Sequence, residues 1–255
     1  MMQGMFTAKS AVIAQQRRLD TIANNLANIN TTGFKASRAD FKDTLYTTMH
    51  RPVEPQNASL TLGSGVLVSA TVRSFLAGTP IQTGIGLDFC LTQDGFFTVM
   101  NGQSEKLYTR DGSFAVSNED GGRFLVTADG FYVLDKSGSR ITLPEGDISN
   151  LKLDTAGSLS IGSEEPFATL GIAAFKNNGG LMAAGRNCFI ETEASGSAEL
   201  LEEPEVQQGF LESSNVDLSE EITKLIRSQR AFSFAATALT TADEMHAMAN
   251  NMRSS

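Results

Sequence analysis

Residues 19–35 read LDTIANNLANINTTGFK, and this stretch decides how the N-terminal part of the chain folds. One apolar stripe recurs in it at spacings of three, four and three residues: Leu19, Ile22, Leu26 and Ile29. This spacing places the four side chains along one side of an α-helix. Gly33 follows, and glycine suits the left-handed conformation that closes a helix. We therefore predict a helix over residues 1–30.

The same stripe extends back toward the N-terminus as a heptad pattern in which only Gln15 is polar. Its positions are Met5, Ala8, Val12, Gln15, Leu19, Ile22, Leu26 and Ile29. Asn24, Asn25, Asn28 and Asn30 crowd its flanks, although asparagine is a poor helix former. Neutral amides can hydrogen-bond across an interface without repulsion between like charges, so we interpret them as interface residues.

The C-terminal region shows a second helical pattern. Asp217 followed by Glu220 matches a capping box at a helix start. The apolar stripe after it comprises Leu218, Ile222, Leu225, Gln229, Phe232, Ala236 and Leu239, and drifts to Ala238, Ala242, Met245, Ala249 and Met252. Two stripes at opposite ends of one chain either pack on each other as a hairpin or are buried between chains. Isolated helices are marginal in water, which favours burial between chains.

The region between the helices changes to a period of two. Leu87, Phe89 and Leu91 alternate with polar or small residues, and Asp-Gly recurs at residues 94–95, 111–112 and 129–130. These features predict an antiparallel β domain. The predicted fold is α+β, with an N-terminal helix in 1–35, a connecting segment over 36–62, a β-rich middle over 63–212 and a C-terminal helix in 213–255.

Composition excludes several classes of partner. The net charge of −9 and the pI near 4.8 argue against nucleic acid or an anionic membrane surface. No apolar run reaches the roughly 18 residues that a membrane-spanning helix needs. The short run after Lys9 does not resemble a secretory signal. We expect no direct membrane insertion, and a chain that is cytosolic or exported without a cleaved signal peptide.

No pattern of catalytic or metal-binding residues stands out, and none is predicted, nor is a cofactor. His50 and His246 lie far apart in the sequence, and the Asp-Gly sites lack the alternating ligands of an EF-hand loop. Cys90 and Cys188 are the only cysteines. Buried free thiols are favoured for them, with a disulfide left open.

Several stretches resemble the bacterial flagellar rod and hook proteins, the axial proteins of the basal body. QQRRLDTIANNLANINTTGFKASRADFKDTLY is similar to the N-terminal signature of this family. QGFLESSNVDLSEEITKLIRSQRAFSFAATALTTADEM is similar to its C-terminal signature. LGSGV, QTGIGLDFCLTQDGFF, YTRDGSF and VTADGF resemble the β domain of rod-type members, with the distal rod nearest.

The resemblance implies a structural role in the basal body. Members polymerise helically into a hollow axial tube whose core is a coiled-coil-like layer of terminal helices. They bind copies of themselves and other axial rod and hook proteins, and the flagellar type III export apparatus carries them beyond the inner membrane. The implied assembly-interface residues are Met5, Val12, Leu19, Ile22, Asn24, Asn25, Leu26, Asn28, Ile29, Gly33, Ile222, Leu225, Gln229, Phe232, Ala236, Leu239 and Met245.

Other functions stay open from the sequence. Within the family, a proximal rod protein or a hook-type paralogue is the alternative to a distal rod protein. Outside it, a β-rich adhesin or scaffold would share the middle domain but has no need for apolar stripes at both chain ends. An unrecognised enzyme is the remaining alternative.

Overall fold

The computed structural model describes residues 2–48, 61–119, 122–144, 151–154, 157–162, 165–202 and 204–254. The chain forms two compact units. The helix–hairpin unit comprises Met1–Ala27, Ser37–Arg73 and Val216–Ser255, and the β unit comprises Asn28–Ala36 and Ser74–Asn215. His50 lies outside the described residues.

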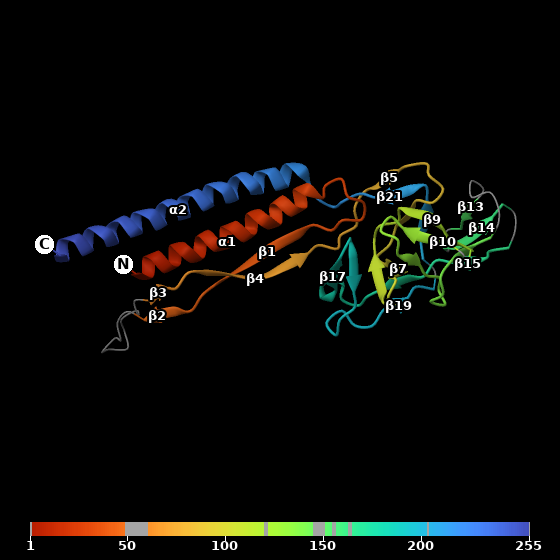
Figure 1. The fold of residues 1–255 in the computed structure, drawn as a ribbon, viewed down its shortest axis with the longest axis horizontal. Helices are drawn as coiled ribbons and strands as arrows, with labels where there is room; N and C mark the ends of the chain where they lie inside the picture. The colour runs from red at the N-terminus through yellow and green to blue at the C-terminus, as the bar shows by residue number, and fades with distance from the viewer. Residues whose placement is uncertain are drawn as a thin grey trace, which may run out of the picture. The chain divides into compact units, whose positions relative to one another are not determined.

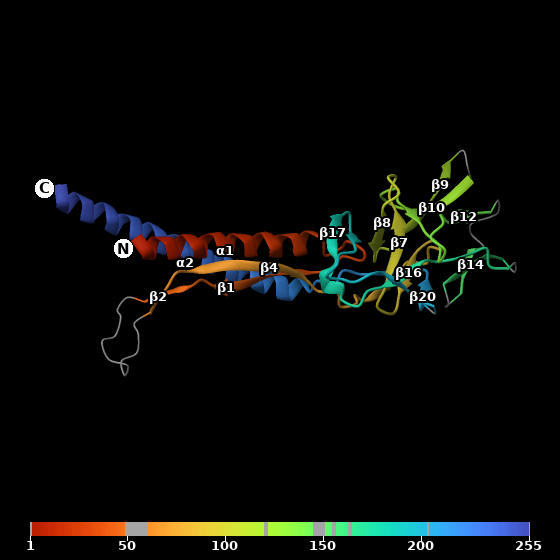
Figure 2. The same cartoon turned by 90° about the horizontal axis from the view of Figure 1, so that it is seen from below.

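Two long helices dominate the helix–hairpin unit. Helix α1 (Met2–Ala27) and helix α2 (Leu218–Ser254) pack side by side and antiparallel, as Figures 1 and 2 show. The backbone N–H of Glu220 donates to Oδ1 of Asp217 at 3.0 Å, so the predicted N-cap is confirmed. The two apolar stripes therefore meet, at least in part, within one chain.

A β-hairpin lies along α1 in the same unit (Figures 1 and 2). Strand β1 (Ser37–Asp43) pairs antiparallel with β4 (Val66–Arg73), with a bulge after Asp40. Beyond them β2 (Tyr46–Thr48) pairs with β3 (Thr61–Gly63). The guanidinium of Arg18 on α1 lies 5.7 Å from the ring centre of Phe41 on β1, a cation–π contact.

The β unit is built from short antiparallel strands. Its largest sheet has the order β12-β10-β11-β7-β8-β18-β17, with β9 paired to β10 and β16 paired to β7 and β19. A second sheet has the order β13-β14-β15, and β20 pairs with β6 and β21 with β5. The bounds are β5 Pro80–Gln82, β6 Phe89–Leu91, β7 Phe96–Met100, β8 Lys106–Thr109, β9 Phe114–Glu119, β10 Gly122–Thr127, β11 Tyr132–Val133, β12 Thr142–Leu143, β13 Leu151–Leu153, β14 Ser158–Ile161, β15 Ala168–Thr169, β16 Ile172–Ala174, β17 Met182–Gly185, β18 Cys188–Ile190, β19 Glu199–Leu200, β20 Val206–Gln208 and β21 Phe210–Glu212.

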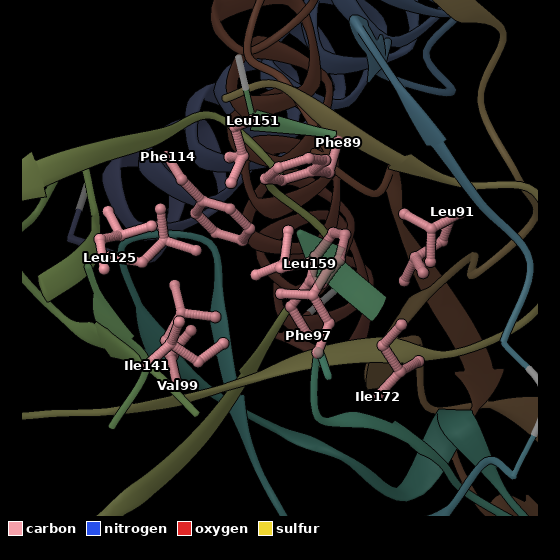
Figure 3. Close-up of a cluster of buried hydrophobic side chains, with 14 of the residues drawn as sticks. Phe89, Leu91, Phe97, Val99, Phe114, Leu125, Ile141, Leu151, Leu159 and Ile172 are labelled. Atoms are coloured by element: carbon pink, nitrogen blue, oxygen red, sulfur yellow. The ribbon is translucent and has the colours of Figure 1, made fainter. Parts of the chain in front are cut away.

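These strands enclose a hydrophobic core. Figure 3 shows side chains from several strands converging on one cluster, including Phe97, Phe114 and Leu159. The rings of Phe97 and Phe114 meet edge to face with centres 5.2 Å apart. A second cluster gathers around Phe96 and Phe189. Cys90 and Cys188 are buried free thiols, as favoured from the sequence.

The α+β class is confirmed, but the units do not follow the expected boundaries. Residues 63–73 belong with the helices, because β4 pairs with β1 rather than with the middle strands. Residues 28–36 belong with the β unit, although they follow α1 directly. The period-two pattern identified strands correctly but carried no information about their partners.

Only one of the three Asp-Gly pairs forms the turn of a β-hairpin. Gly130 has φ +82° and links β10 to β11, which pair with each other. The pairs at 94–95 and 111–112 instead join strands that do not pair together. A Cβ at Gly112 would lie 1.8 Å from the carbonyl oxygen of Phe89. There the glycine allows a close backbone approach rather than a tight hairpin.

Candidate assembly site

The asparagine-rich end of α1 is explained first by contacts within the chain. The side-chain amide of Asn25 donates to the carbonyl oxygen of Ser37 at 2.7 Å and to Oε2 of Glu221 at 3.1 Å. Its Oδ1 accepts from the backbone N–H of Ser37 at 2.9 Å. One buried amide thus joins α1, β1 and α2 within the chain.

Glu221 continues this polar contact on α2. Lys224 donates to its Oε1 at 2.7 Å, and Glu221 is 4% exposed. Partial burial lowers the pKa of Lys224, but hydrogen bonds to Glu221 and Glu220 outweigh it and leave that pKa above its ordinary value. A buried charge needs a partner, which Lys224 supplies on the same helix, while the hydrogen bond from Asn25 to Glu221 fixes how the start of α2 lies on α1.

The helix–hairpin unit buries very little else. Among its described residues, the buried ones are Ala14, Ile22, Asn25, Glu221 and Ser228. Three of the five carry polar side chains. Two helices of 26 and 37 residues therefore share almost no closed apolar core within one chain. Because helices depend mainly on packing for stability, this unit is incomplete as an isolated body.

Large apolar side chains remain exposed on both helices. On α1 these are Phe6 and Ile13; on α2 they are Leu218, Ile222, Ile226, Phe234, Met245, Met248 and Met252. Phe234 is 76% exposed and Met252 75%. A row of this length on one helix exceeds the scattered apolar residues of an ordinary surface and is typical of an interaction site.

The predicted interface residues fall into three groups. The buried ones are Ile22, Asn25 and Gly33. The half-buried ones are Met5, Val12, Leu19, Leu26, Asn28, Ile29, Leu225, Phe232, Ala236 and Leu239. The exposed ones are Asn24, Ile222, Gln229 and Met245. The structure gathers most of them on the two helices, while Asn28, Ile29 and Gly33 lie in the β unit.

Gly33 holds the segment after α1 against the β unit. It adopts φ +64°, as the sequence predicted, and its N–H donates to the carbonyl oxygen of Glu212 at 2.8 Å. A Cβ at this position would lie 2.7 Å from the backbone carbon of Arg110 and the backbone nitrogen of Asp111. Glycine is required here both for its conformation and for this close approach.

Next to Gly33 lies a buried charge cluster, which we define as Lys35, Arg110 and Glu212. Lys35 Nζ lies 2.6 Å from Oε1 of Glu212, and Arg110 Nη1 lies 3.2 Å from its Oε2. The three residues are 1%, 3% and 2% exposed. Asp94, which is exposed, lies 3.6 Å from Arg110 Nη2. Two buried cations thus share one buried carboxylate.

Burying the charges of this cluster costs free energy, and hydrogen bonds to backbone groups hold the cluster in place. Burial lowers the pKa of Lys35 below its ordinary value, and Glu212 offsets that effect only in part. Lys35 also donates to the carbonyl oxygen of Leu76 at 2.7 Å, and Glu212 accepts from the N–H of Gly78 at 2.7 Å. Asn215 accepts from the N–H of Ala36 at 2.7 Å. The segments that precede β1 and α2 are therefore anchored in the β unit.

Sequence reasoning missed this cluster. Its members stand in TGFK, YTRDGSF and LESSNV, three stretches that carry the family resemblance. Helical and strand periodicity concerns apolar residues, so it gives no signal for buried charges. Their positions inside signature stretches, away from the apolar stripes, were the available hint.

Comparisons with known proteins place the chain. The family model described as "Flagella basal body rod protein" matches residues 5–35. "Flagellar hook protein FlgE/F/G D1 domain" matches residues 91–161, and "Flagellar basal body rod FlgEFG protein C-terminal" matches residues 207–252.

Similar full-length proteins agree. The flagellar basal-body rod protein FlgG of Borreliella burgdorferi is 38% identical, with 99% of this chain and 99% of the relative covered. FlgG of Caulobacter vibrioides is 36% identical, covering 99% of this chain and 100% of the relative. The chain belongs to the flagellar basal-body rod protein family. The hook-basal body complex protein FlhP of Bacillus subtilis is 31% identical, covering 99% of this chain and all of that protein.

The buried charge cluster draws one residue from each region that matches this rod family. Lys35 lies in the N-terminal region, Arg110 in the D1 region and Glu212 in the C-terminal region. The cluster thus joins the three regions in one chain.

Among the described residues, no helix is long and apolar enough to cross a bilayer.

Proposed function

We propose that this chain is a structural subunit of the bacterial flagellar rod that polymerises helically into the hollow axial shaft of the basal body. The observation that carries the proposal is the helix–hairpin unit, whose helices expose long apolar rows while burying few side chains. Copies of the chain cover these rows in the assembled tube. Family membership and the names of its relatives support the same role.

The energetics favour assembly over a soluble monomer. Burying one large apolar side chain contributes about 1.5–3 kcal/mol. The exposed rows offer several such side chains in every subunit, and a helical polymer repeats each contact along its length. This gain offsets the entropy lost when subunits associate. Helices that are marginal alone become stable in the tube.

The proposal includes location and partners. The chain forms the distal rod, contacts other axial rod and hook proteins, and is exported by the flagellar type III apparatus. It binds no nucleic acid, does not insert into the membrane and performs no catalysis. Its similarity to FlhP, a hook-basal body complex protein, favours a hook-type paralogue as the second candidate.

Phe234 allows a direct test in the source bacterium. Because this side chain is 76% exposed, Phe234→Asp leaves the unfolding temperature of the purified monomer unchanged. In an assembled tube, the carboxylate must be desolvated in every subunit, which costs several kcal/mol. We expect basal bodies isolated from these cells to lack the chain and to have an incomplete rod.

Phe234→Leu is the matched control, because it keeps an apolar side chain at the same place. Cells with this variant should assemble rods and swim. Absence of the wild-type chain from isolated basal bodies would refute the proposed function. Normal rods containing Phe234→Asp would show that this helix face is not an assembly surface.

A further inference from the structure

The end of α2 projects past α1, the other long helix that the structure describes. Asn25 on α1 contacts Glu221 on α2, and the helices are antiparallel. Counting along both helices from this contact, Met2 lies opposite about residue 244. Figure 1 shows α2 continuing beyond the start of α1. We call residues 243–252 the C-terminal overhang.

The overhang carries a regular apolar row. Met245, Met248 and Met252 follow at spacings of three and four residues, so they share one side of the helix. They are 48%, 57% and 75% exposed. Methionine is flexible and polarizable, which suits it to a protein contact that tolerates small shifts between subunits.

Helix α1 carries a matching row on its own exposed side. Phe6, Lys9, Ile13 and Arg17 follow at spacings of three, four and four residues. Phe6 is 53% and Ile13 47% exposed, and the two basic residues are exposed as well. We call these four residues the α1 outer row. It covers about the same length of helix as the overhang.

The two surfaces have complementary charge. The α1 outer row contains Lys9 and Arg17, while the overhang begins with Asp243 and Glu244. Within the part of the chain that the structure describes, none of these four takes part in an ion pair. Arg253 follows the overhang, so its acidic character is concentrated at its start.

We infer that the C-terminal overhang of one copy docks on the α1 outer row of a second copy. This inference rests on the proposed function and names the surfaces that build the tube. With the helices antiparallel, as they are inside one chain, Met252 meets Phe6, Met245 meets Ile13, and Glu244 lies within one helical turn of Arg17. This register shifts the second copy by about 12 residues, or about 18 Å, along the helix axis.

The contact joins two different surfaces and therefore propagates. Each copy presents both an overhang and an outer row, so a third copy can bind the second in the same way. A contact between different patches of identical subunits forms an open helical assembly unless its rotation closes a ring. Pairing of two overhangs would instead end at a dimer and leave Phe6 and Ile13 uncovered.

Disulfide trapping in assembled basal bodies tests the register. Bacteria whose only copy carries both Ile13→Cys and Met245→Cys are grown, and their isolated basal bodies are treated with diamide. Inside one chain the two positions lie about 18 Å apart along the helices, beyond the roughly 7 Å that a disulfide spans. The native Cys90 and Cys188 are buried. A ladder of covalent multimers is therefore expected.

The controls separate the possible contacts. Ile13→Cys alone and Ile13→Cys combined with Thr223→Cys, at an exposed position near the other end of α2, should give no ladder. Dimers from Met245→Cys alone would overturn the proposal in favour of paired overhangs. A chain present in basal bodies but without a ladder from the double variant would also overturn it, while leaving the proposed function intact. Absence of the unmodified chain from basal bodies would refute both.

Charge exchange provides a second measurement that needs no cysteines. Arg17→Glu or Glu244→Arg should lower the amount of chain in basal bodies at least about tenfold, since 1.4 kcal/mol is a tenfold change in binding. Combining both changes in one chain should restore assembly. If the combined variant assembles no better than either alone, these surfaces do not meet.

Discussion

The two units of this chain bury their side chains in opposite ways. In the β unit, Phe89, Phe97 and Leu125 are fully buried within one large cluster. In the helix–hairpin unit, among its described residues, Ile22 and Ala14 are the buried apolar ones. The β unit therefore has an apolar core of its own, whereas the helices bury almost no apolar side chains within the chain. The chain thus combines a well-packed β unit with a helix–hairpin unit that buries few apolar side chains.

Each unit also contains buried polar contacts, here called polar anchors, that join separate segments of the chain. In the β unit, Glu212 binds two buried cations and joins segments far apart in the sequence. In the helix–hairpin unit, Asn25 and Glu221 join α1, β1 and α2 at a single place. The β unit combines its polar anchor with a large apolar core, whereas the helix–hairpin unit buries few apolar side chains besides its polar anchor.

Glu212→Ala should destabilise the β unit by about 3–5 kcal/mol, because it leaves Lys35 buried without an ion-pair partner and Arg110 with only the exposed Asp94. Hydrogen exchange read by mass spectrometry should show faster exchange throughout the β strands. Glu199→Ala, at an exposed position on β19, is the matched control and should change the free energy of unfolding by less than about 0.5 kcal/mol.

Lys35→Met sharpens the same comparison. It removes one of two cations and keeps a chain of similar length, so Glu212 still pairs with Arg110. The loss of stability should be clearly smaller than that of Glu212→Ala. Equal losses would show that packing around Lys35, rather than the balance of buried charge, determines the effect.

Gly33→Ala should destabilise the β unit by about 2–3 kcal/mol. Its positive φ costs an alanine about 1–2 kcal/mol, and the new Cβ would meet the backbone of Arg110 and Asp111. Gly84→Ala separates the two causes, since Gly84 has φ +71° with nothing within 4 Å of the added Cβ. Chemical denaturation of both variants should place Gly84→Ala closer to the wild type; the reverse order would refute the clash.

Asn25→Ala should cost about 1–2 kcal/mol within the helix–hairpin unit alone. It removes the hydrogen bonds that the amide makes to buried Glu221 and to the half-buried backbone of Ser37. Hydrogen exchange should accelerate in α1, β1 and the start of α2. It should stay unchanged in the strands of the β unit. Gln16→Ala, on the exposed side of α1, is the control. Faster exchange in the β strands would show that the two units do not unfold separately.

Local patterns in the sequence were sufficient for the fold class and the helices. The spacing of Leu19, Ile22 and Leu26 requires a helix, and Asp217 marks the start of the other. Strand pairing was not predictable in the same way. Residues 63–73 read as the start of the β domain but pair with β1, because the period of two identifies a strand without its neighbour.

The polar anchors escaped prediction for a related reason. Lysine, arginine and glutamate are usually exposed, so Lys35, Arg110 and Glu212 gave no sign of burial in the sequence. Their cluster exists only after three distant segments have come together. Asn25 was singled out, but its contacts with Ser37 and Glu221 depend on how α1 lies on β1 and α2.

The smallest expected effect concerns Cys188, buried in the β unit. Burial, reinforced by the charge of Asp129, raises the pKa of this thiol from 9.0 to about 11. Above pH 9 the unfolded chain releases this proton while the folded chain keeps it, so stability is complete below pH 9 and falls as the pH rises toward 11. At pH 10 the loss amounts to about 1.4 kcal/mol. Chemical denaturation under a reductant measures the free energy of unfolding at pH 8 and pH 10. Between these pH values, Cys188→Ala should lose about 1.4 kcal/mol less of this free energy than the wild type. Tyr108, whose pKa burial and Glu191 raise to about 12, contributes equally to both proteins and cancels from the difference. Equal slopes for the two proteins would mean that the thiol ionises as readily in the folded β unit as in water, and the contrast between a closed β unit and open helices would lose its support at this site.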